Sequence, residues 1–205
     1  MCEIHHGGIA TTDDVHEWYK RSLAYFQNKS LEQTVVDSTI DLLVKCGAIH
    51  QEDDELKCRA IGKVSSMFYF SPFDVSNLFY NFRNLFNANK EDDDYSVAMS
   101  LADIDSQRMG IVSKLEKQEM DDFAKKVRHL FPGKAFVDPV LKAGFCYYNL
   151  LSGKTPQACA SFQRNLQFDY NRLSQVLQSL DSLGGKWEQE GYFKSLEGRI
   201  ANGVP

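Results

Sequence analysis

Residues 152–155 read Ser-Gly-Lys-Thr, the four letters that close a nucleotide-binding P-loop. A P-loop needs a glycine five positions before its Gly-Lys pair, after a strand, so that backbone N–H groups can surround the phosphates. The residue at that position is Tyr148, which lies within a helical pattern. The string instead predicts a corner between two helices. Gly153 ends one helix, Thr155 caps the next, and Pro156 takes its first position.

The other candidates for chemistry are weaker. Cys2, His5 and His6 are possible metal ligands, but adjacent histidines do not normally converge on one ion and no further ligand spacing follows. A flexible or partly paired N-terminal segment is favoured there. The acidic run at residues 91–94 lacks the alternating spacing and glycine of a calcium loop, and it predicts a solvated loop. No GxSxG, HExxH or paired Cys–His signature occurs. We therefore expect no catalytic residue, metal or cofactor, and no enzyme activity from this chain alone.

Composition sets limits on location and partners. The five cysteines are scattered, odd in number and without a CxxC pair, which favours a reducing intracellular compartment, cytoplasmic or nuclear. No apolar run approaches the ~18 residues of a membrane span, so we expect no membrane partner. The net charge of −5 argues against bulk electrostatic binding of nucleic acid, although a local neutral or basic face remains compatible with it.

The first third of the chain predicts two helices and a hairpin. Apolar residues at helical spacing indicate a helix over residues 13–27, with Thr12 as its N-cap. Ser30 and Gln33 form a capping box that opens a second helix. Two short apolar strands then flank the acidic turn at residues 52–55. This order is typical of a winged helix whose wing is a small β-hairpin.

The rest of the chain predicts helices. After a short helix that ends before Pro72, we expect helices over residues 72–87, 95–104, 113–131, 138–151, 169–183 and 187–201. The helix over 113–131 places Leu115, Met120, Phe123, Val127 and Leu130 on one face. We predict a mostly α protein in which a winged-helix domain, residues 1–71, packs on a multi-helix bundle, residues 72–205.

A dense group of aromatic residues joins the two predicted domains. They could offer stacking platforms for bases. Aromatic residues at helical spacing are more often core, and we favour packing of the winged helix onto the bundle. The group consists of Phe68, Tyr69, Phe70, Phe73, Phe79, Tyr80, Phe82 and Phe86.

The predicted helix over residues 169–183 has two distinct stripes. Its apolar stripe, expected to face the bundle, is formed by Tyr170, Leu173, Val176, Leu177, Leu180 and Leu183. A second stripe holds one cation, Arg172, and three neutral polar residues, Gln175, Ser179 and Ser182, with no carboxylate. A helix face without carboxylates is compatible with binding the negatively charged backbone of a nucleic acid. The alternative is an ordinary polar stripe that faces solvent.

Several stretches, in their order, resemble the C-terminal region of Ski-like superfamily-two helicases, which include archaeal Hel-type repair helicases and meiotic and spliceosomal members. "CEIHHGGIATTDDVHEWYKRSL" resembles the segment that enters their winged helix, and "LKCRAIGKVSSMFYFSP" is similar to the stretch after their wing. "DPVLKAGFCYYNLLSGKTPQ", "DYNRLSQVLQSL" and "WEQEGYFKSLEGRIANGV" are similar to their later helical bundle. Together these stretches cover nearly the whole chain.

The resemblance implies a role for the second stripe. In Hel-type members a so-called ratchet helix lies along the translocating strand and offers it an arginine and, two turns later, a stacking tryptophan. The arginine position falls on Arg172, and the tryptophan position falls on Ser179, where this sequence departs from the pattern. The resemblance thus implies nucleic-acid binding through Arg172, Gln175 and Ser179, with Asn171 beside them, by hydrogen bonds rather than by base stacking.

Two functions remain open from the sequence. The first is an accessory module of a Ski-like DNA helicase in repair or replication. It would guide single-stranded nucleic acid, DNA in preference to RNA, while a motor subunit hydrolyses ATP. The family's motor domains are missing from these 205 residues, which are either a fragment of a helicase or a stand-alone remnant. The second is a protein-interaction scaffold derived from the same region, which the net charge of −5 suits better.

Overall fold

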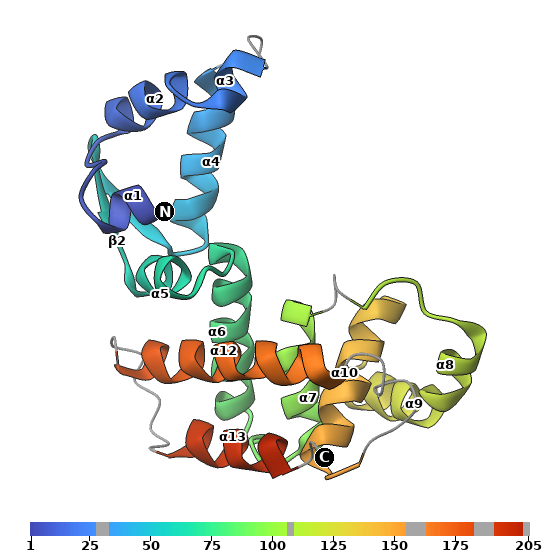
Figure 1. The fold of residues 1–205 in the computed structure, drawn as a ribbon. Helices are drawn as coiled ribbons and strands as arrows, with labels where there is room; N and C mark the ends of the chain where they lie inside the picture. The colour runs from blue at the N-terminus through green and yellow to red at the C-terminus, as the bar shows by residue number, and fades with distance from the viewer. Residues whose placement is uncertain (28–32, 106–108, 155–162, 183–190, 203–205) are drawn as a thin grey trace. The chain divides into compact units, whose positions relative to one another are not determined.

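The computed structural model describes residues 1–27, 33–105, 109–154, 163–182 and 191–202. These residues form twelve helices and one antiparallel hairpin (Figure 1). The predicted mostly α fold with a small hairpin near the N-terminus is therefore confirmed. The elements are α1 (Cys2–His5), α2 (Thr12–Lys20), α3 (Leu23–Gln27), α4 (Gln33–Lys45), β1 (Ile49–Glu52), β2 (Glu55–Cys58), α5 (Ala60–Phe68), α6 (Pro72–Asn87), α7 (Asp94–Asp105), α8 (Lys114–Glu119), α9 (Asp121–Leu130), α10 (Asp138–Leu151), α12 (Gln163–Ser182) and α13 (Tyr192–Asn202).

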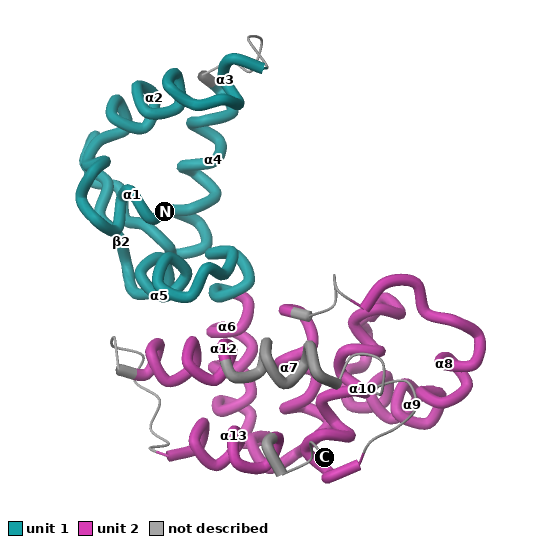
Figure 2. The backbone as a smooth tube through the Cα atoms, viewed as in Figure 1, with its two compact units in different colours: residues 1–76 teal, residues 77–205 magenta. Residues whose placement is uncertain are grey.

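The chain divides into two compact units, residues 1–76 and 77–205, shown in teal and magenta in Figure 2. Helix α6 begins in the first unit and continues into the second. The sequence places a domain boundary between residues 71 and 72, at the start of this helix. The division lies inside α6 because its first turn belongs with the N-terminal elements.

Helix α2 begins one residue earlier than predicted. Its N-cap is Thr11, not Thr12, and a capping box closes the helix end. The Thr11 hydroxyl accepts a hydrogen bond from the Asp14 N–H at 3.1 Å, and Asp14 accepts from the Thr11 N–H at 3.0 Å. The Ala10 N–H also donates to Asp14 at 3.0 Å. These hydrogen bonds, the one from Ala10 first, lower the pKa of Asp14 because they favour the carboxylate.

The single helix predicted over residues 13–27 is wrong, because the helix breaks after Lys20. The Arg21 N–H still bonds back to Trp18, and the Ser22 hydroxyl then accepts a hydrogen bond from the Tyr25 N–H at 3.3 Å. The Ser22 hydroxyl therefore stabilises the start of a new helix, α3, at Leu23. A serine side chain competes for backbone N–H groups in this way, which is why it favours helix starts over helix interiors.

The hairpin follows α4 directly, as predicted. Strand β1 pairs antiparallel with β2 in the register Ile49↔Cys58 to Glu52↔Glu55, and Asp53 supplies a positive φ of 52° at the turn. Residue Thr11 makes an isolated bridge to Glu55 on the other side of β2.

The core beneath the hairpin contains Val36, Ile40, Ile49 and Leu56, with Met1, Ile4, Val15, Tyr19, Leu43 and Val44 packed against it. Val35, on the same helix, is 40% exposed. Of the predicted capping box, Ser30 lies outside the described residues, as does the side chain of Gln33.

In the second unit α10 packs along α7, where Tyr95 and Tyr148 stack with their ring centroids 4.3 Å apart.

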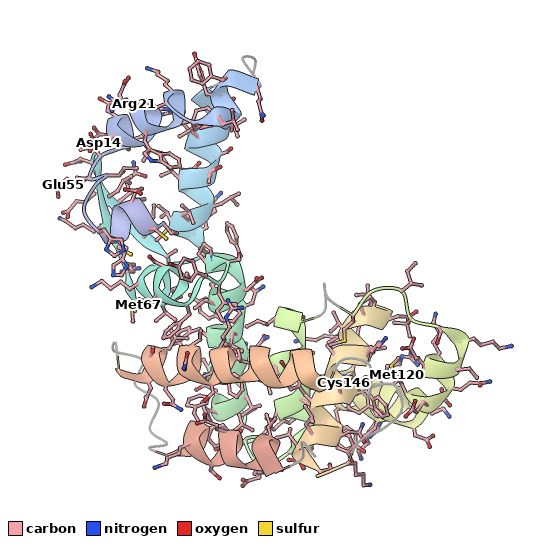
Figure 3. All side chains as sticks on the ribbon, viewed as in Figure 1. Asp14, Arg21, Glu55, Met67, Met120 and Cys146 are labelled. Atoms are coloured by element: carbon pink, nitrogen blue, oxygen red, sulfur yellow. The ribbon has the colours of Figure 1, made fainter. Side chains whose placement is uncertain are left out.

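The helix predicted over residues 113–131 is in fact two helices, α8 and α9, that meet at Met120. Acidic residues follow Met120 directly, and carboxylates favour a helix N-terminus. Met120 is buried, as is Cys146 of α10; both are labelled in Figure 3. Leu115, predicted on the buried face, is 77% exposed.

One buried ion pair joins α8 to α10. The Lys142 side chain is only 2% exposed, and its Nζ lies 2.5 Å from Oε1 of Glu116. Nζ also donates to the Met109 carbonyl at 3.4 Å. Oε2 of Glu116 accepts from the Ser113 N–H at 2.7 Å, so this carboxylate both completes the α8 capping box and neutralises the lysine. The hydrogen bond from Lys142 is the main cause that lowers the pKa of Glu116.

The aromatic group around α5 and α6 is only partly core. Phe82 is fully buried, and its ring packs against Phe193 of α13 at a centroid distance of 5.4 Å. Tyr69 is 85% exposed, and Phe73 and Tyr80 are also exposed. The core prediction is therefore confirmed for Phe82 and wrong for these three. Tyr69 ends α5 in the left-handed conformation, with a positive φ of 56°.

Candidate nucleic-acid interface

Helix α12, orange in Figure 1, carries the predicted stripe of neutral polar residues. It begins at Gln163, six residues before the predicted start, and runs to Ser182. Its inner face is apolar as predicted. At most 1% of the surface of each of these side chains is exposed: Leu173, Val176, Leu177 and Leu180. Burial of these four side chains fixes the rotation of the helix. Tyr170, also predicted for this stripe, has a side chain outside the described residues, as does Leu183.

The outer face brings together three of the predicted residues. Gln175 is exposed, and Arg172 and Ser179 are half-buried. At 100° per residue the three positions fall within about 60° of one another around the helix axis. Along the axis they span about 10 Å, close to the rise of three stacked nucleotides. This face could therefore contact a short run of an extended strand.

Asn171 lies on α12 as well, but its side chain and that of Ser182 are outside the described residues. The helix register puts position 171 about 40° from Gln175 and about 100° from Arg172. Asn171 is thus at the edge of the face rather than at its centre.

A carboxylate borders this face, which the sequence does not reveal. The Gln178 amide donates to the buried Ser174 hydroxyl at 3.1 Å and to Oε2 of Glu197 at 3.0 Å. Glu197 belongs to α13, which lies beside α12 in Figure 1. The prediction of a face without acid holds for the stripe itself but not for its surroundings, because the acid comes from the neighbouring helix.

Helix α13 is anchored to the acidic run at residues 91–94, which was predicted as a solvated loop. Arg199 pairs with Asp94 at 2.6 Å, and the Tyr192 hydroxyl donates to the Glu91 carbonyl at 3.0 Å. Asp93 caps α7 by accepting from the Ser96 N–H at 3.2 Å. The acidic run therefore has a structural role: it caps α7 and holds α13 in place. Burial is the main cause that raises the pKa of Tyr192.

Charge is divided unequally between the units. Residues 1–76 contain 12 acidic and seven basic side chains, whereas residues 77–205 contain 16 of each. The entire net charge of −5 therefore belongs to the first unit. The exposed side of α4 illustrates this, with Asp37 and Asp41 exposed along it. A polyanion meets less repulsion at the second unit, which includes α12.

The other sequence candidates have plain structural roles where they are described. Tyr148 lies inside α10, and Gly153 follows that helix with a φ of 67°, so no strand precedes the Ser-Gly-Lys-Thr string. Thr155 and Pro156 lie outside the described residues. His5 pairs with the Ser66 hydroxyl at 3.1 Å and belongs to the short helix α1. The described part of the chain holds no group of three or more His, Cys, Asp or Glu side chains placed to bind a metal ion.

Comparisons with known proteins leave the family open. Neither a protein-family model nor a curated protein matches this chain. Among the described helices, none combines the length and the apolar character that a membrane span requires.

Proposed function

We propose that this protein is an accessory module that guides single-stranded nucleic acid, DNA in preference to RNA, for a Ski-like helicase whose separate motor hydrolyses ATP. One observation carries the proposal: Arg172, Gln175 and Ser179 share one face of α12, on the unit that has no net charge. The arginine would pair with a phosphate, and the neutral groups would bond to phosphate or base edges.

We further propose that unit 1 is a winged helix with β1 and β2 as its wing, packed on the bundle of unit 2. In helix-turn-helix proteins the second helix enters the major groove. The helix before the hairpin here is α4, whose exposed side carries Asp37 and Asp41. Two carboxylates on that side would repel the phosphate backbone. This unit therefore serves as a docking platform for the motor rather than as a reader of duplex DNA.

A strand-binding measurement tests the α12 face. We would titrate a labelled single strand of ~20 nucleotides, within the range of site sizes for such proteins, and follow fluorescence anisotropy at two salt concentrations. Binding should weaken with salt, but only with a shallow slope, because few phosphates are neutralised. Arg172→Ala should reduce affinity about tenfold or more, the typical loss for a charged hydrogen bond.

A charge reversal at an exposed position separates binding from folding. Gln175→Glu adds a carboxylate to the face without touching the core, so it should weaken strand binding and leave the melting temperature unchanged. Gln118→Glu, at an exposed position of α8, is the matched control and should leave affinity unchanged. Equal affinities for the parent protein, Arg172→Ala and Gln175→Glu would show that this face of α12 does not bind the strand.

A protein-interaction scaffold is the second candidate, and a specific observation favours it. Trp18, Leu23 and Phe26 are 53%, 71% and 65% exposed in one short stretch of the acidic unit. Large apolar side chains that remain accessible often mark contact sites for proteins. Capture of a motor subunit that fails with Trp18→Ala but not with Arg172→Ala, in a chain that binds no single strand, would favour the scaffold.

A further inference from the structure

The outer side of helix α5 differs in charge from the rest of the first unit. Residues 56–73, which include this helix, contain no acidic residue, although the unit as a whole has 12 acidic and seven basic side chains. Lys57 is neutralised by ion pairs within the hairpin. Arg59 and Lys63 are exposed, and neither forms an ion pair within the part of the chain that the structure describes. The outer side of α5 is therefore locally basic in an otherwise acidic unit.

Exposed residues follow one another at four-residue intervals along this side of α5. Arg59 is the N-cap, and Lys63 and Met67 occupy positions that a helix places on the same side. All three are exposed. The Lys63 N–H donates to the Arg59 carbonyl at 2.9 Å, so Arg59 is continuous with the first turn. The row is about 12 Å long at the rise of a helix, and Figure 3 labels Met67 at its end.

The row ends in two large, accessible side chains. Met67 is 52% exposed, and Tyr69, at the C-cap of the helix, is 85% exposed. Ile61 and Val64 on the other side of α5 are buried, which fixes the rotation of the helix and keeps the row outward. Protein contacts are enriched in Arg, Met and Tyr relative to other surfaces. We call the following four residues the α5 strip: Arg59, Lys63, Met67 and Tyr69.

One neighbouring helix brings an acidic residue to this part of the unit. Helix α1 packs on α5, where His5 pairs with the Ser66 hydroxyl at 3.1 Å. Glu3 of α1 is exposed, but within the described residues it forms no ion pair with Arg59 or Lys63. The two cations of the α5 strip are therefore available to carboxylates of another molecule.

The charge of the unit favours a protein segment over a nucleic acid as that molecule. A nucleic acid strand extends its phosphates beyond the α5 strip, toward a unit whose net charge is −5. A short protein segment can instead present one or two carboxylates, which Arg59 and Lys63 would neutralise. The thioether of Met67 has no planar ring on which a base could stack, whereas it packs readily against apolar side chains.

We propose that the α5 strip binds a short segment of a partner protein in which carboxylates lie beside large apolar side chains. Arg59 and Lys63 would pair with the carboxylates, and Met67 and Tyr69 would contact the apolar side chains. This inference rests on the docking role proposed above for the first unit, and it specifies where the partner binds and what chemistry the partner carries.

Selection from a phage-displayed library of random peptides tests the proposal on the full chain. The same library is selected in parallel on the parent protein and on Lys63→Glu. Peptides in which Asp or Glu lies beside Leu, Ile or Phe should be enriched on the parent and not on the variant, because the α5 strip loses a cation and gains a carboxylate. Enrichment of peptides without carboxylates, or the same enrichment on both proteins, would refute the proposal. A library that yields no enriched peptide on the parent would refute it as well.

The affinity of one enriched peptide, labelled and followed by fluorescence anisotropy, locates its site. Lys63→Glu should weaken binding about tenfold or more, and Met67→Ala should weaken it severalfold. Arg21→Glu is the matched control and should have no effect: it makes the same change of charge at an exposed position, which lies at the opposite end of this unit from Met67 in Figure 3. All three substitutions change exposed side chains and should leave the melting temperature unchanged.

Strand binding separates this inference from the proposed function. Lys63→Glu should leave the affinity for the labelled single strand unchanged, and Arg172→Ala should leave the affinity for the peptide unchanged. Failure of this inference and failure of the α12 face are therefore distinguishable. A single strand whose affinity falls with Lys63→Glu as much as that of the peptide would assign the α5 strip to nucleic acid and overturn the protein partner.

Discussion

The ion pair between Lys142 and Glu116 predicts an unequal response to removal of its two charges. Glu116→Gln keeps the side-chain shape but removes the carboxylate that lies 2.5 Å from the ammonium of Lys142, whose side chain is 2% exposed. Removing one partner of a buried pair typically costs about 3–5 kcal/mol, because the other charge stays buried. Glu116→Gln should therefore lower the free energy of unfolding, by at most about that amount.

Lys142→Met should behave differently. It removes the buried charge and fills nearly the same volume with an apolar side chain, a replacement that is often neutral or stabilising by about 1–4 kcal/mol. Glu116 is 21% exposed and still accepts from the Ser113 N–H, so its carboxylate keeps a partner after the change. The double variant should match Lys142→Met alone.

Denaturant unfolding followed by far-ultraviolet circular dichroism gives these free energies from the transition of the second unit. The pH dependence gives an independent check. The pKa of Glu116 is lowered below its ordinary value of 4.5, so the pair stabilises the protein fully above that pH. The contribution should disappear as the pH falls through the lowered pKa. Equal losses for Glu116→Gln and Lys142→Met would refute the reasoning.

Further predictions concern packing and ionisation. Gly62→Ala should destabilise the protein by about 1–3 kcal/mol in denaturant unfolding, because the new Cβ would meet the Ala48 carbonyl. Gly198→Ala is the matched control: its Cβ meets nothing within 4 Å, and it should stabilise by about 0.5–1 kcal/mol. Tyr95, whose pKa is raised to about 12 chiefly by its hydrogen bond with Tyr148, should remain protonated well above pH 10 in ultraviolet titration. Because this pKa is raised, the stabilisation is present below pH 10 and is lost as the pH rises through about 12. Tyr148→Phe should return the pKa of Tyr95 toward 10.

The sequence predicts most elements of this fold because their patterns are local. Pro72 starts α6 and Asp138 starts α10, as expected from proline and helical spacing. The errors also have a local cause. Ser22 and Met120 interrupt helical patterns that look continuous, because a hydroxyl or a following carboxylate starts a new helix. Periodicity alone cannot detect these breaks.

The candidate site is less predictable because its surroundings come from other helices. The rotation of α12 follows from its apolar stripe, which places Gln175 outward. The sequence of α12 does not predict the contact with Glu197, whose carboxylate accepts a hydrogen bond from Gln178 across the α12–α13 contact. Long-range contacts of this kind require the three-dimensional structure.

Site-specific photocrosslinking tests the central claim most directly. A photoreactive amino acid in place of Gln175 on α12, or of Asp37 on α4, would be irradiated with a labelled single strand at low salt; both positions are exposed. Our account predicts a crosslink to the strand from position 175 and none from position 37, because only the first lies on the proposed strand-guiding face. A crosslink from position 37 but not from position 175 would contradict it.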